Sequence, residues 1–408
     1  MPVLLREMAF FTAHILLYAL ASSAIIYALL VLVRRHLRHS STLLRAAHRI
    51  LDPPHSTAAD RLRARALPNA RLERAFSLSN TFVRPDPATH DDFVRTAGRF
   101  LSRARDWEAL RATADVSTEA ALRNAGKVAA YGEFIQEVTL RYVLTGLLDV
   151  GTLSGSAEES VLIQRVAALI TELWVRSKHE RVRDEKRLDE LNAALRELVP
   201  DADTFPNPLD WVIPTWETMW RVVAVAIAHT VDDAGARGAL LAFYKETTAA
   251  RYTHRTDSGT PAVSDLIDEA LRLYPPTRHI YRIADGPSLL STILPTSLIS
   301  FLRLPTHTTL TEAADIEGIQ RSPVWHAPDA WEPIRHSPSR RTADQAATML
   351  AFGHGRNACV ARTWAPMAAG VLVAAVLRTL GDGGRLSGGR RWAGARGGVG
   401  VCGMTGSD

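Results

Sequence analysis

The segment 351–367, AFGHGRNACVARTWAPM, places a cysteine between a glycine-rich turn and a helical run. Phe352, Gly353 and Gly355 precede Cys359, and a stretch rich in Ala, Val and Leu follows it. Glycine allows the backbone to approach a flat ligand closely. A cysteine at the start of a helix lies in the positive field of the helix N-terminus, which favours the thiolate. A thiolate in such an apolar segment predicts ligation of a soft metal centre rather than acid–base catalysis.

The rest of the chain is long enough to enclose such a site, because 408 residues can bury a large core as one domain or two. The net charge of +5 is spread along the chain, without Lys/Arg blocks interleaved with aromatic residues, so a nucleic-acid-binding protein has little support. The second cysteine, Cys402, lies in a glycine-rich tail, and two cysteines make no disulfide framework. An unpaired functional thiolate fits a reducing compartment that faces the cytosol.

The N-terminal run 8–33 contains no Asp, Glu, Lys or Arg, and a bilayer span needs roughly 20 such residues. Arg34, Arg35 and Arg38 follow directly, so the positive-inside rule places residues 1–7 in the lumen and the body in the cytosol. A cleaved signal peptide and a buried core helix are the alternatives. The run is longer than a signal-peptide core, and its charges lie on the opposite side.

Residues 34–60 predict a basic linker on the cytosolic side of this anchor, where basic side chains contact lipid headgroups. Pro53 and Pro54 end its helical pattern after Leu51.

Periodic apolar patterns predict helices in the central part of the chain, over 61–115, 126–148, 158–198 and 232–250. Breaks are expected at Pro68 and at 85–87. The segment 176–187 alternates in charge sign, which is typical of a solvated face. Trp107 and Arg111 are four residues apart and share a helix face. A surface helix with a packed tryptophan explains this pair as well as a binding site does.

Glu217 and Thr218 lie in the apolar segment 211–228 and can supply an acid and an alcohol. Pro214 lacks the backbone N–H, so a helix is expected to kink or to begin there. In the alternative interpretation Glu217 is an ordinary acid of a first helical turn. The segment 246–248, Glu-Thr-Thr, is a rival pair without small residues before it.

Glu269 and Arg272 are one helical turn apart and can form an ion pair on one face of a helix. Pro275 and Pro276 end that helix, and an extended stretch that contains Arg282 follows. Further along the chain, the segment 331–335, Trp-Glu-Pro-Ile-Arg, supplies another arginine, Arg335.

In this order the segments resemble the cytochrome P450 family, firmly from 211 to 380 and loosely before. Its cysteine-loop pattern, F-G-x-G-x-[RH]-x-C-x-[GA], is matched by Phe352, Gly353, Gly355, Cys359 and Ala361. Asn357 stands where the family usually has Arg or His, and Arg356 lies one position earlier. The remaining matches are W-x-x-x-R at 107–111, the acid–alcohol pair at 217–218, E-x-x-R with Pro-Pro at 269–276, and F-x-P-x-R at 331–335. Pro214 and Thr215 replace the small residues that the family has before the acid–alcohol pair.

The resemblance implies a mainly α fold with small β-sheets behind a single N-terminal transmembrane helix. The haem domain is expected over 61–380, followed by a Gly/Arg-rich tail over 381–408 that is expected to be disordered. The cofactor would be haem b, with the Cys359 thiolate as axial ligand of the iron. The family pattern assigns its propionates to Arg282, Arg356 and Arg111, proton delivery to Glu217 and Thr218, and a structural triad to Glu269, Arg272 and Arg335.

The activity implied by the resemblance is mono-oxygenation of a small, mostly apolar organic molecule by an enzyme of the endoplasmic reticulum membrane. Electrons would come from NADPH-cytochrome P450 reductase, with cytochrome b5 as a further candidate partner. Arg340, Arg341, Arg356 and Arg362 could steer the acidic surface of this reductase. A haem-thiolate isomerase, dehydratase or peroxygenase is one alternative, and a non-catalytic, membrane-anchored remnant of the fold is another.

Overall fold

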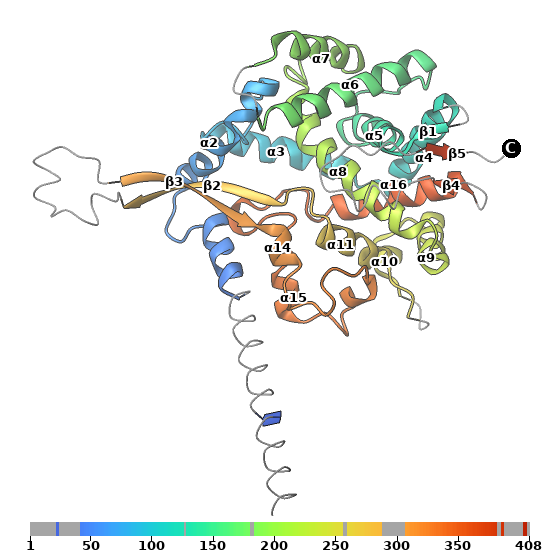
Figure 1. The fold of residues 1–408 in the computed structure, drawn as a ribbon. Coiled ribbons are helices and arrows are strands. Elements are labelled where there is room, and N and C mark those ends of the chain that lie inside the picture. Colours follow the sequence, from blue (N-terminus) through green and yellow to red (C-terminus); the bar gives the residue numbers. More distant parts are fainter. Residues whose placement is uncertain are drawn as a thin grey trace, which may run out of the picture.

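The computed structural model describes residues 22–23, 41–125, 128–179, 183–255, 259–287, 307–381, 385–386 and 403–405. The fold is mainly helical, as expected (Figure 1). After a helix over 41–51, the α-helices are α2 (Ala58–Phe76), α3 (Pro87–Arg103), α4 (Trp107–Ala125), α5 (Tyr131–Tyr142), α6 (Ala157–Arg176), α7 (Glu185–Leu198), α8 (Leu209–Thr230), α9 (Ala234–Lys245), α10 (Ala249–Thr253), α11 (Val263–Leu273), α14 (Ile316–Gln320), α15 (Ala343–Ala347) and α16 (Ala365–Leu380). Shorter elements are the π-helical turn η1 (Val143–Leu148) and the 3-10 turns η2 (Pro333–His336) and η3 (Gly355–Asn357).

Two small antiparallel sheets accompany the helices. β2 (His279–Pro287) and β3 (His307–Asp315) form a hairpin that projects to the left in Figure 1 and runs beside α2. β1 (Val128–Ala130), β5 (Gly403–Thr405) and β4 (Arg385–Leu386) form the other sheet in that spatial order. The tail after 381, expected to be disordered, therefore contributes two short strands.

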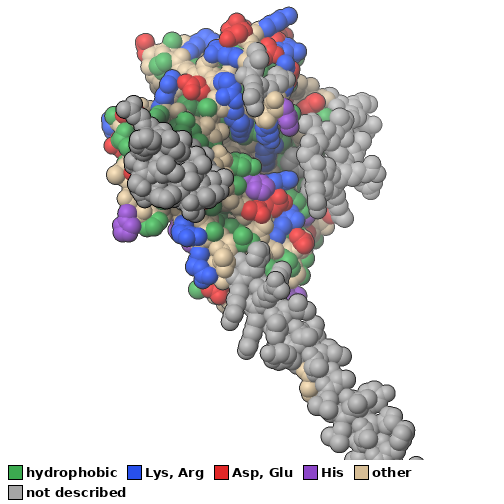
Figure 2. Space-filling model, turned by 60° about the vertical axis from the view of Figure 1, so that its left-hand side comes forward, with side chains coloured by type: hydrophobic (Ala, Val, Ile, Leu, Met, Phe, Trp, Pro, Cys, Tyr) green, Lys and Arg blue, Asp and Glu red, His purple; other side chains and the backbone are tan. Residues whose placement is uncertain are grey.

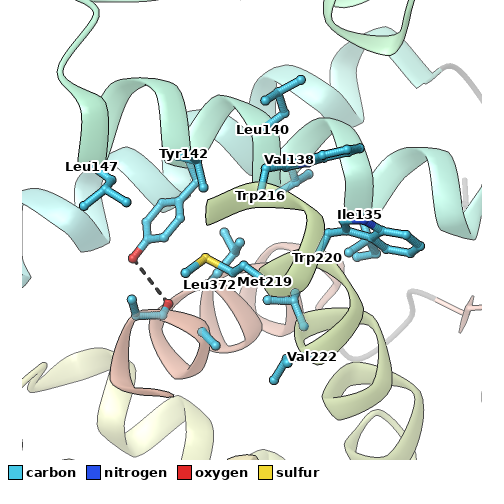
Figure 3. Packing of buried hydrophobic residues seen from close by; sticks show 14 of the residues in the cluster. Ile135, Val138, Leu140, Tyr142, Leu147, Trp216, Met219, Trp220, Val222 and Leu372 are labelled. Carbon is cyan, nitrogen blue, oxygen red and sulfur yellow. Dashed lines mark hydrogen bonds between the residues drawn. The ribbon is translucent and has the colours of Figure 1, made fainter. Parts of the chain in front are cut away.

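The centre of the molecule is built around α8, which packs against α5 and against α16. α16 is apolar on all sides, which suits a helix enclosed by others. Figure 3 shows side chains of the three helices interleaved, with the Tyr142 hydroxyl donating to the Ala368 carbonyl at 3.3 Å. The indole N–H of Trp216 donates to the Gln136 carbonyl at 3.0 Å, so α8 is held to α5 by a polar bond inside an apolar interface.

Of the two expectations at Pro214, a helix start there is wrong, since α8 begins at Leu209 and continues through the proline. Pro214 has no N–H for the carbonyl of Asp210, four residues earlier. The side-chain amide of Asn80 donates to that carbonyl instead, at 2.8 Å. A partner from another segment therefore allows the helix to start before its proline.

Three further helix boundaries differ from the sequence prediction. Pro68 lies inside α2, whose buried face, which includes Leu62 and Phe76, favours a continuous helix despite the lost bond. The predicted helix over 126–148 is divided into β1, α5 and η1. The predicted helix over 158–198 is interrupted after α6, because the Asp184 side chain accepts the Arg187 N–H and caps a new helix, α7.

The helix over 41–51 ends before the two prolines, as predicted, but it is packed on the body of the protein. Ala47 and Leu51 are each 2% exposed in a small core with Ala314, Ile316, Ile319 and Leu350. Of the predicted anchor at 8–33, only Ser22 and Ser23 belong to the described residues, so the anchor stays a prediction. Within the described ranges, none of the helices combines the length and apolarity needed to cross a membrane.

Candidate functional site

The cysteine loop folds back on itself directly before α16. The backbone N–H of Cys359 donates to the Phe352 carbonyl at 2.8 Å, and that of Gly353 donates to the Leu350 carbonyl at 2.8 Å. Gly353 and Gly355 have φ angles of 75° and 67°, in the left-handed region that favours glycine. The glycines expected from the pattern thus make the turn that presents Cys359.

The Cys359 thiol lies among protein atoms but remains accessible. Burial raises its pKa above the ordinary value, whereas a hydrogen bond from the Ala361 N–H and the positive charge of Arg362 act in the opposite direction. These two groups favour the thiolate once a cation is available to pair with it. An accessible sulfur in a protein surround can accept a metal from its open direction.

Arg356 is occupied by the segment that precedes α2. Its Nε donates to Asp52 Oδ1 at 2.7 Å, and its Nη2 donates to the Pro53 carbonyl at 2.9 Å. A side chain on Gly355 would collide with Asp52, since its Cβ would lie 2.1 Å from Oδ2. These contacts fasten the cysteine loop to 52–56, and the propionate contact expected of Arg356 stays a prediction.

His354 and Asn357 are two further residues of the cysteine loop with informative surroundings. The rings of His354 and His48 are stacked, with centroids 3.7 Å apart, which adds a second link to the helix over 41–51. The side-chain amide nitrogen of Asn357 is buried without a hydrogen-bond partner among the described residues. Asn357, which replaces the arginine or histidine of the family pattern, therefore has a free donor inside the loop.

The predicted triad forms, with an additional member. Arg272 Nε and Nη2 donate to Glu269 at 2.7 and 2.9 Å, which is a bidentate pair, and both side chains are fully buried. Arg335 Nε lies 3.5 Å from Glu269, whereas His336 Nε2 is 2.8 Å away. His336 was missed from the sequence, where it is simply the residue after Arg335.

Gln320 connects this cluster to the cysteine loop. Its side-chain nitrogen donates to the carbonyls of Leu271 and Arg272 at 2.8 and 3.0 Å. Its side-chain oxygen accepts the backbone N–H of Leu350 at 2.8 Å. One buried amide thus ties the end of α11 to the approach of the loop that carries Cys359.

Glu217 and Thr218 lie on α8, which packs on α16 directly after the cysteine loop. Glu217 is buried, forms an ion pair with Arg221, and accepts the Trp220 indole N–H at 3.2 Å. Thr218 is half-buried. The rival pair at 246–247 lies between α9 and α10, outside any long helix.

Arg282, on β2, and Arg65, on α2, are two cations close enough to repel each other. Burial lowers the pKa of Arg282 to about 10, and burial together with the Arg282 charge lowers the pKa of Arg65 to about 10. Arg65 is 7% exposed, its Nη2 donates to the Thr81 carbonyl at 2.6 Å, and its Nε has no partner in the part of the chain that the structure describes. Neither guanidinium forms an ion pair with any described acid. Arg65, which the sequence did not single out, completes a pair suited to carboxylates.

Arg111 has local partners on the surface of α4. Its Nη2 lies 2.5 Å from Glu108, and its guanidinium lies 5.3 Å from the centroid of the Tyr244 ring. Trp107, one turn earlier, packs against Trp364 with centroids 6.5 Å apart. The tryptophan of the W-x-x-x-R pattern therefore lies beside the start of α16, and a propionate contact from Arg111 stays a prediction.

These side chains fit a haem. Cys359 is an accessible sulfur donor after a close-approach turn, and Arg65 and Arg282 are desolvated cations that no described acid neutralises. Among the described residues there is no cluster of three His, Cys, Asp or Glu side chains that could hold a bare metal ion. A single thiolate accompanied by carboxylate-binding arginines suits iron carried in a macrocycle with acidic side chains.

Comparison with known proteins identifies the fold. No protein-family model matches the sequence, and no curated protein matches it. Among solved structures, a six-coordinated cytochrome P450 from Thermus thermophilus is 15% identical, with 89% of this chain and 90% of that chain covered and a TM-score of 0.53. CYP164A2 from Mycobacterium smegmatis is 17% identical, with 88% of each chain covered and a TM-score of 0.51. This chain has the fold of cytochrome P450 haem domains.

The haem domain of cytochrome P450DA is also similar, at 14% identity and a TM-score of 0.52, with 78% of this chain and 75% of that chain covered. These similarities confirm the expected P450 fold at sequence identities too low to transfer function. The activity therefore has to be argued from the site itself.

Proposed function

We propose that this protein is a haem-thiolate monooxygenase that inserts one oxygen atom from O2 into a small organic substrate. The observation that carries the proposal is the position of Cys359. Its sulfur is accessible and receives the Ala361 N–H at the end of a turn made by two left-handed glycines, in a chain with the P450 fold.

Cys359 would bind the iron of haem b through its thiolate, and Arg65 and Arg282 would hold the propionates. The haem, when bound, supplies dioxygen activation, which a thiolate ligand promotes by donating electron density. The Ala361 N–H and the Arg362 charge would keep the sulfur anionic. The Glu269 cluster would hold α11 and the loop in register through Gln320.

Proton delivery would rest on Thr218 and Glu217 on α8. Thr218 is the alcohol that can pass a proton through water to the site. Glu217 would act through water as well, although its carboxylate is already engaged by Arg221 and by the Trp220 indole N–H. Thr218→Ala is therefore expected to uncouple oxygen and NADPH consumption from product formation.

The pairing of Glu217 with Arg221 also favours a second candidate function. A haem-thiolate peroxygenase, isomerase or dehydratase needs no protons for cleavage of bound dioxygen. Turnover with peroxide, or without any oxidant, that Thr218→Ala leaves unchanged would select this alternative.

The decisive experiment is the absorption spectrum of the purified, reduced, CO-bound protein. A haem-thiolate band is expected for the natural sequence, and Cys359→Ala is expected to lose it while Cys402→Ala retains it. Loss of the band in the natural protein would contradict both enzyme functions. It would favour a non-catalytic, membrane-anchored remnant of the fold.

A flavoprotein reductase is the proposed electron donor, with cytochrome b5 as a further candidate. Arg340 and Arg362 are exposed, whereas Arg341 pairs with Asp268 at 3.2 Å and Arg356 pairs with Asp52. Arg340 and Arg362, which form no ion pair with a described acid, are therefore the proposed steering charges. Because Arg362 also acts on the Cys359 sulfur, the test reverses Arg340 alone. Arg340→Glu is expected to slow reduction about threefold or more at low salt, and Lys245→Glu to have little effect.

The proposed location is the endoplasmic reticulum membrane, with one span over 8–33 and the haem domain in the cytosol. The charge-free run and the arginines after it support this orientation. Protease protection of a tag at the N-terminus, and digestion of the domain, in intact microsomes would test it.

A further inference from the structure

Three cations from different segments converge beside α8. They are Arg71 on α2, Lys178 just after α6, and Arg221 on α8. Arg71 Nη1 donates to the Ser177 hydroxyl at 2.7 Å, which brings its guanidinium next to Lys178. Glu217, the ion-pair partner of Arg221, also attracts both Arg71 and Lys178. One carboxylate thus faces three positive charges, and an excess of positive charge remains.

Two of the three cations, Arg71 and Arg221, are half-buried, whereas Lys178 is exposed. Burial lowers the pKa of Lys178, and repulsion from Arg71 and Arg221 lowers it further. Burial also lowers the pKa of Arg71. Like charges held together in a partly desolvated place repel one another strongly, and a bound anion would relieve that repulsion.

The cations are bordered by indole rings. The Arg71 guanidinium lies 4.7 Å from the centroid of Trp174, and the Arg221 guanidinium lies 4.3 Å from that of Trp220. The side of the molecule that carries α2 is turned forward in Figure 2, where Lys and Arg side chains gather in the upper middle near hydrophobic ones. Cations next to flat apolar walls suit a ligand that has both a charged and an apolar part.

We propose that Arg71, Lys178 and Arg221 bind the carboxylate of an otherwise apolar substrate. The inference rests on the proposed function, in which Glu217 and Thr218 of α8 serve the substrate site, and Glu217 is the ion-pair partner of Arg221. It narrows the substrate class from apolar molecules to apolar acids. Arg71 and Arg221 are half-buried against tryptophans, which favours a small ligand over the flat surface of an anionic membrane.

The test compares dodecanoate with dodecanol as ligands of the full-length protein, by displacement of a fluorescent fatty acid. Dodecanoate is expected to bind at least tenfold more tightly than dodecanol. Lys178→Ala is expected to weaken dodecanoate about tenfold and to leave dodecanol unchanged, and Lys178→Arg to restore binding. Lys245→Ala removes one exposed lysine at the end of α9 and is expected to change neither.

Equal binding of the acid and the alcohol, or an equal loss of both in Lys178→Ala, would overturn the proposal. The proposal would also be overturned if Lys178→Ala weakened only the binding of phosphatidylserine vesicles, because the three cations would then contact membrane lipids. The reduced CO spectrum of the same samples separates the two ideas. A missing haem-thiolate band with intact selectivity for dodecanoate refutes the proposed function, but it leaves the acid site in place. A normal band without this selectivity refutes the acid site alone.

Discussion

At the scale of single residues, Glu269 is a buried carboxylate held by several partners. It accepts a bidentate pair from Arg272, the His336 ring nitrogen at 2.8 Å and the Glu332 backbone N–H at 2.9 Å. Burial raises its pKa, but hydrogen bonds from Arg272 and His336 outweigh burial and bring the pKa from 4.5 to about 2. Its charged form therefore stabilises the fold fully above about pH 4.5, and this stabilisation is lost as the pH falls through about 2.

Glu269→Gln is expected to lower the free energy of unfolding by about 3–5 kcal/mol at neutral pH, because it leaves Arg272 buried without a counter-charge. The difference from the natural protein should shrink as the pH falls from about 4.5 to about 2, because Glu269 takes up a proton first in the unfolded chain and only near pH 2 in the folded one. Urea unfolding at several pH values measures this difference in the free energy of unfolding. Glu332→Gln, at a residue 40% exposed, is the control and should lose about 1 kcal/mol or less. A difference that stays constant down to about pH 3 would contradict this account.

Gly353 and Gly355, the two glycines of the cysteine loop, allow backbone strain to be compared with steric collision. Both have positive φ, but a Cβ on Gly353 would lie 3.8 Å from its nearest neighbour, whereas one on Gly355 would meet Asp52 at 2.1 Å. Gly353→Ala is therefore expected to lose about 1–2 kcal/mol from backbone strain alone. Gly355→Ala should lose more and release the Arg356–Asp52 pair. Thermal unfolding measures both, and equal losses would refute the steric role of Asp52.

At the scale of elements, α8 depends on a side chain outside itself. Asn80 occupies the Asp210 carbonyl that Pro214 leaves without an N–H, and the Asp210 carboxylate accepts the backbone N–H of Ser79 at 2.8 Å. The start of α8 and the loop before α3 therefore stabilise each other. Because this start carries the turn before Glu217, the dependence extends to the proposed site.

A double-mutant cycle isolates the Asn80 contact. Asn80→Ala is expected to lower the free energy of unfolding by about 1–3 kcal/mol, because a buried carbonyl loses its donor. In a Pro214→Ala background the loss should be smaller, since the restored backbone N–H can serve that carbonyl. The bond from the Phe82 N–H to Asn80 is lost in both backgrounds and cancels. Equal losses in urea unfolding would show that the proline and Asn80 are not coupled.

At the scale of the whole molecule, the N-terminal segment over 41–56 belongs to the folded body. Leu51 and Ala47 fill a core beneath Leu350, and Asp52 holds Arg356 in the cysteine loop. The segment expected to be a linker thus supports the loop that presents Cys359.

Two shortened chains test this role. A chain that begins at Ser41 is expected to keep the unfolding temperature and the haem content of the full chain. A chain that begins at Thr57 should lose several kcal/mol, because burial of Leu51 alone contributes about 1.5–3 kcal/mol, and should bind less haem. Calorimetry and the haem-to-protein ratio measure these outcomes. A chain from Thr57 that matches the one from Ser41 would contradict the role of 41–56.

The sequence alone determined the parts of the protein that depend on local chemistry. Two glycines before a cysteine predict a left-handed turn, Pro53 and Pro54 predict a helix end, and Glu269 and Arg272 predict a helical ion pair. Each follows from backbone sterics or from spacing of a few residues, so it needs no knowledge of distant partners.

Tertiary structure alone decided what depends on groups far apart in the chain. The fold pairs Arg356 with Asp52 and lets Asn80 donate to the Asp210 carbonyl. It also adds His336 to the partners of Glu269 and brings Arg65 near Arg282. No local pattern carries these pairings, because each arises only when packing of the apolar helices brings remote backbone and side chains within bonding distance.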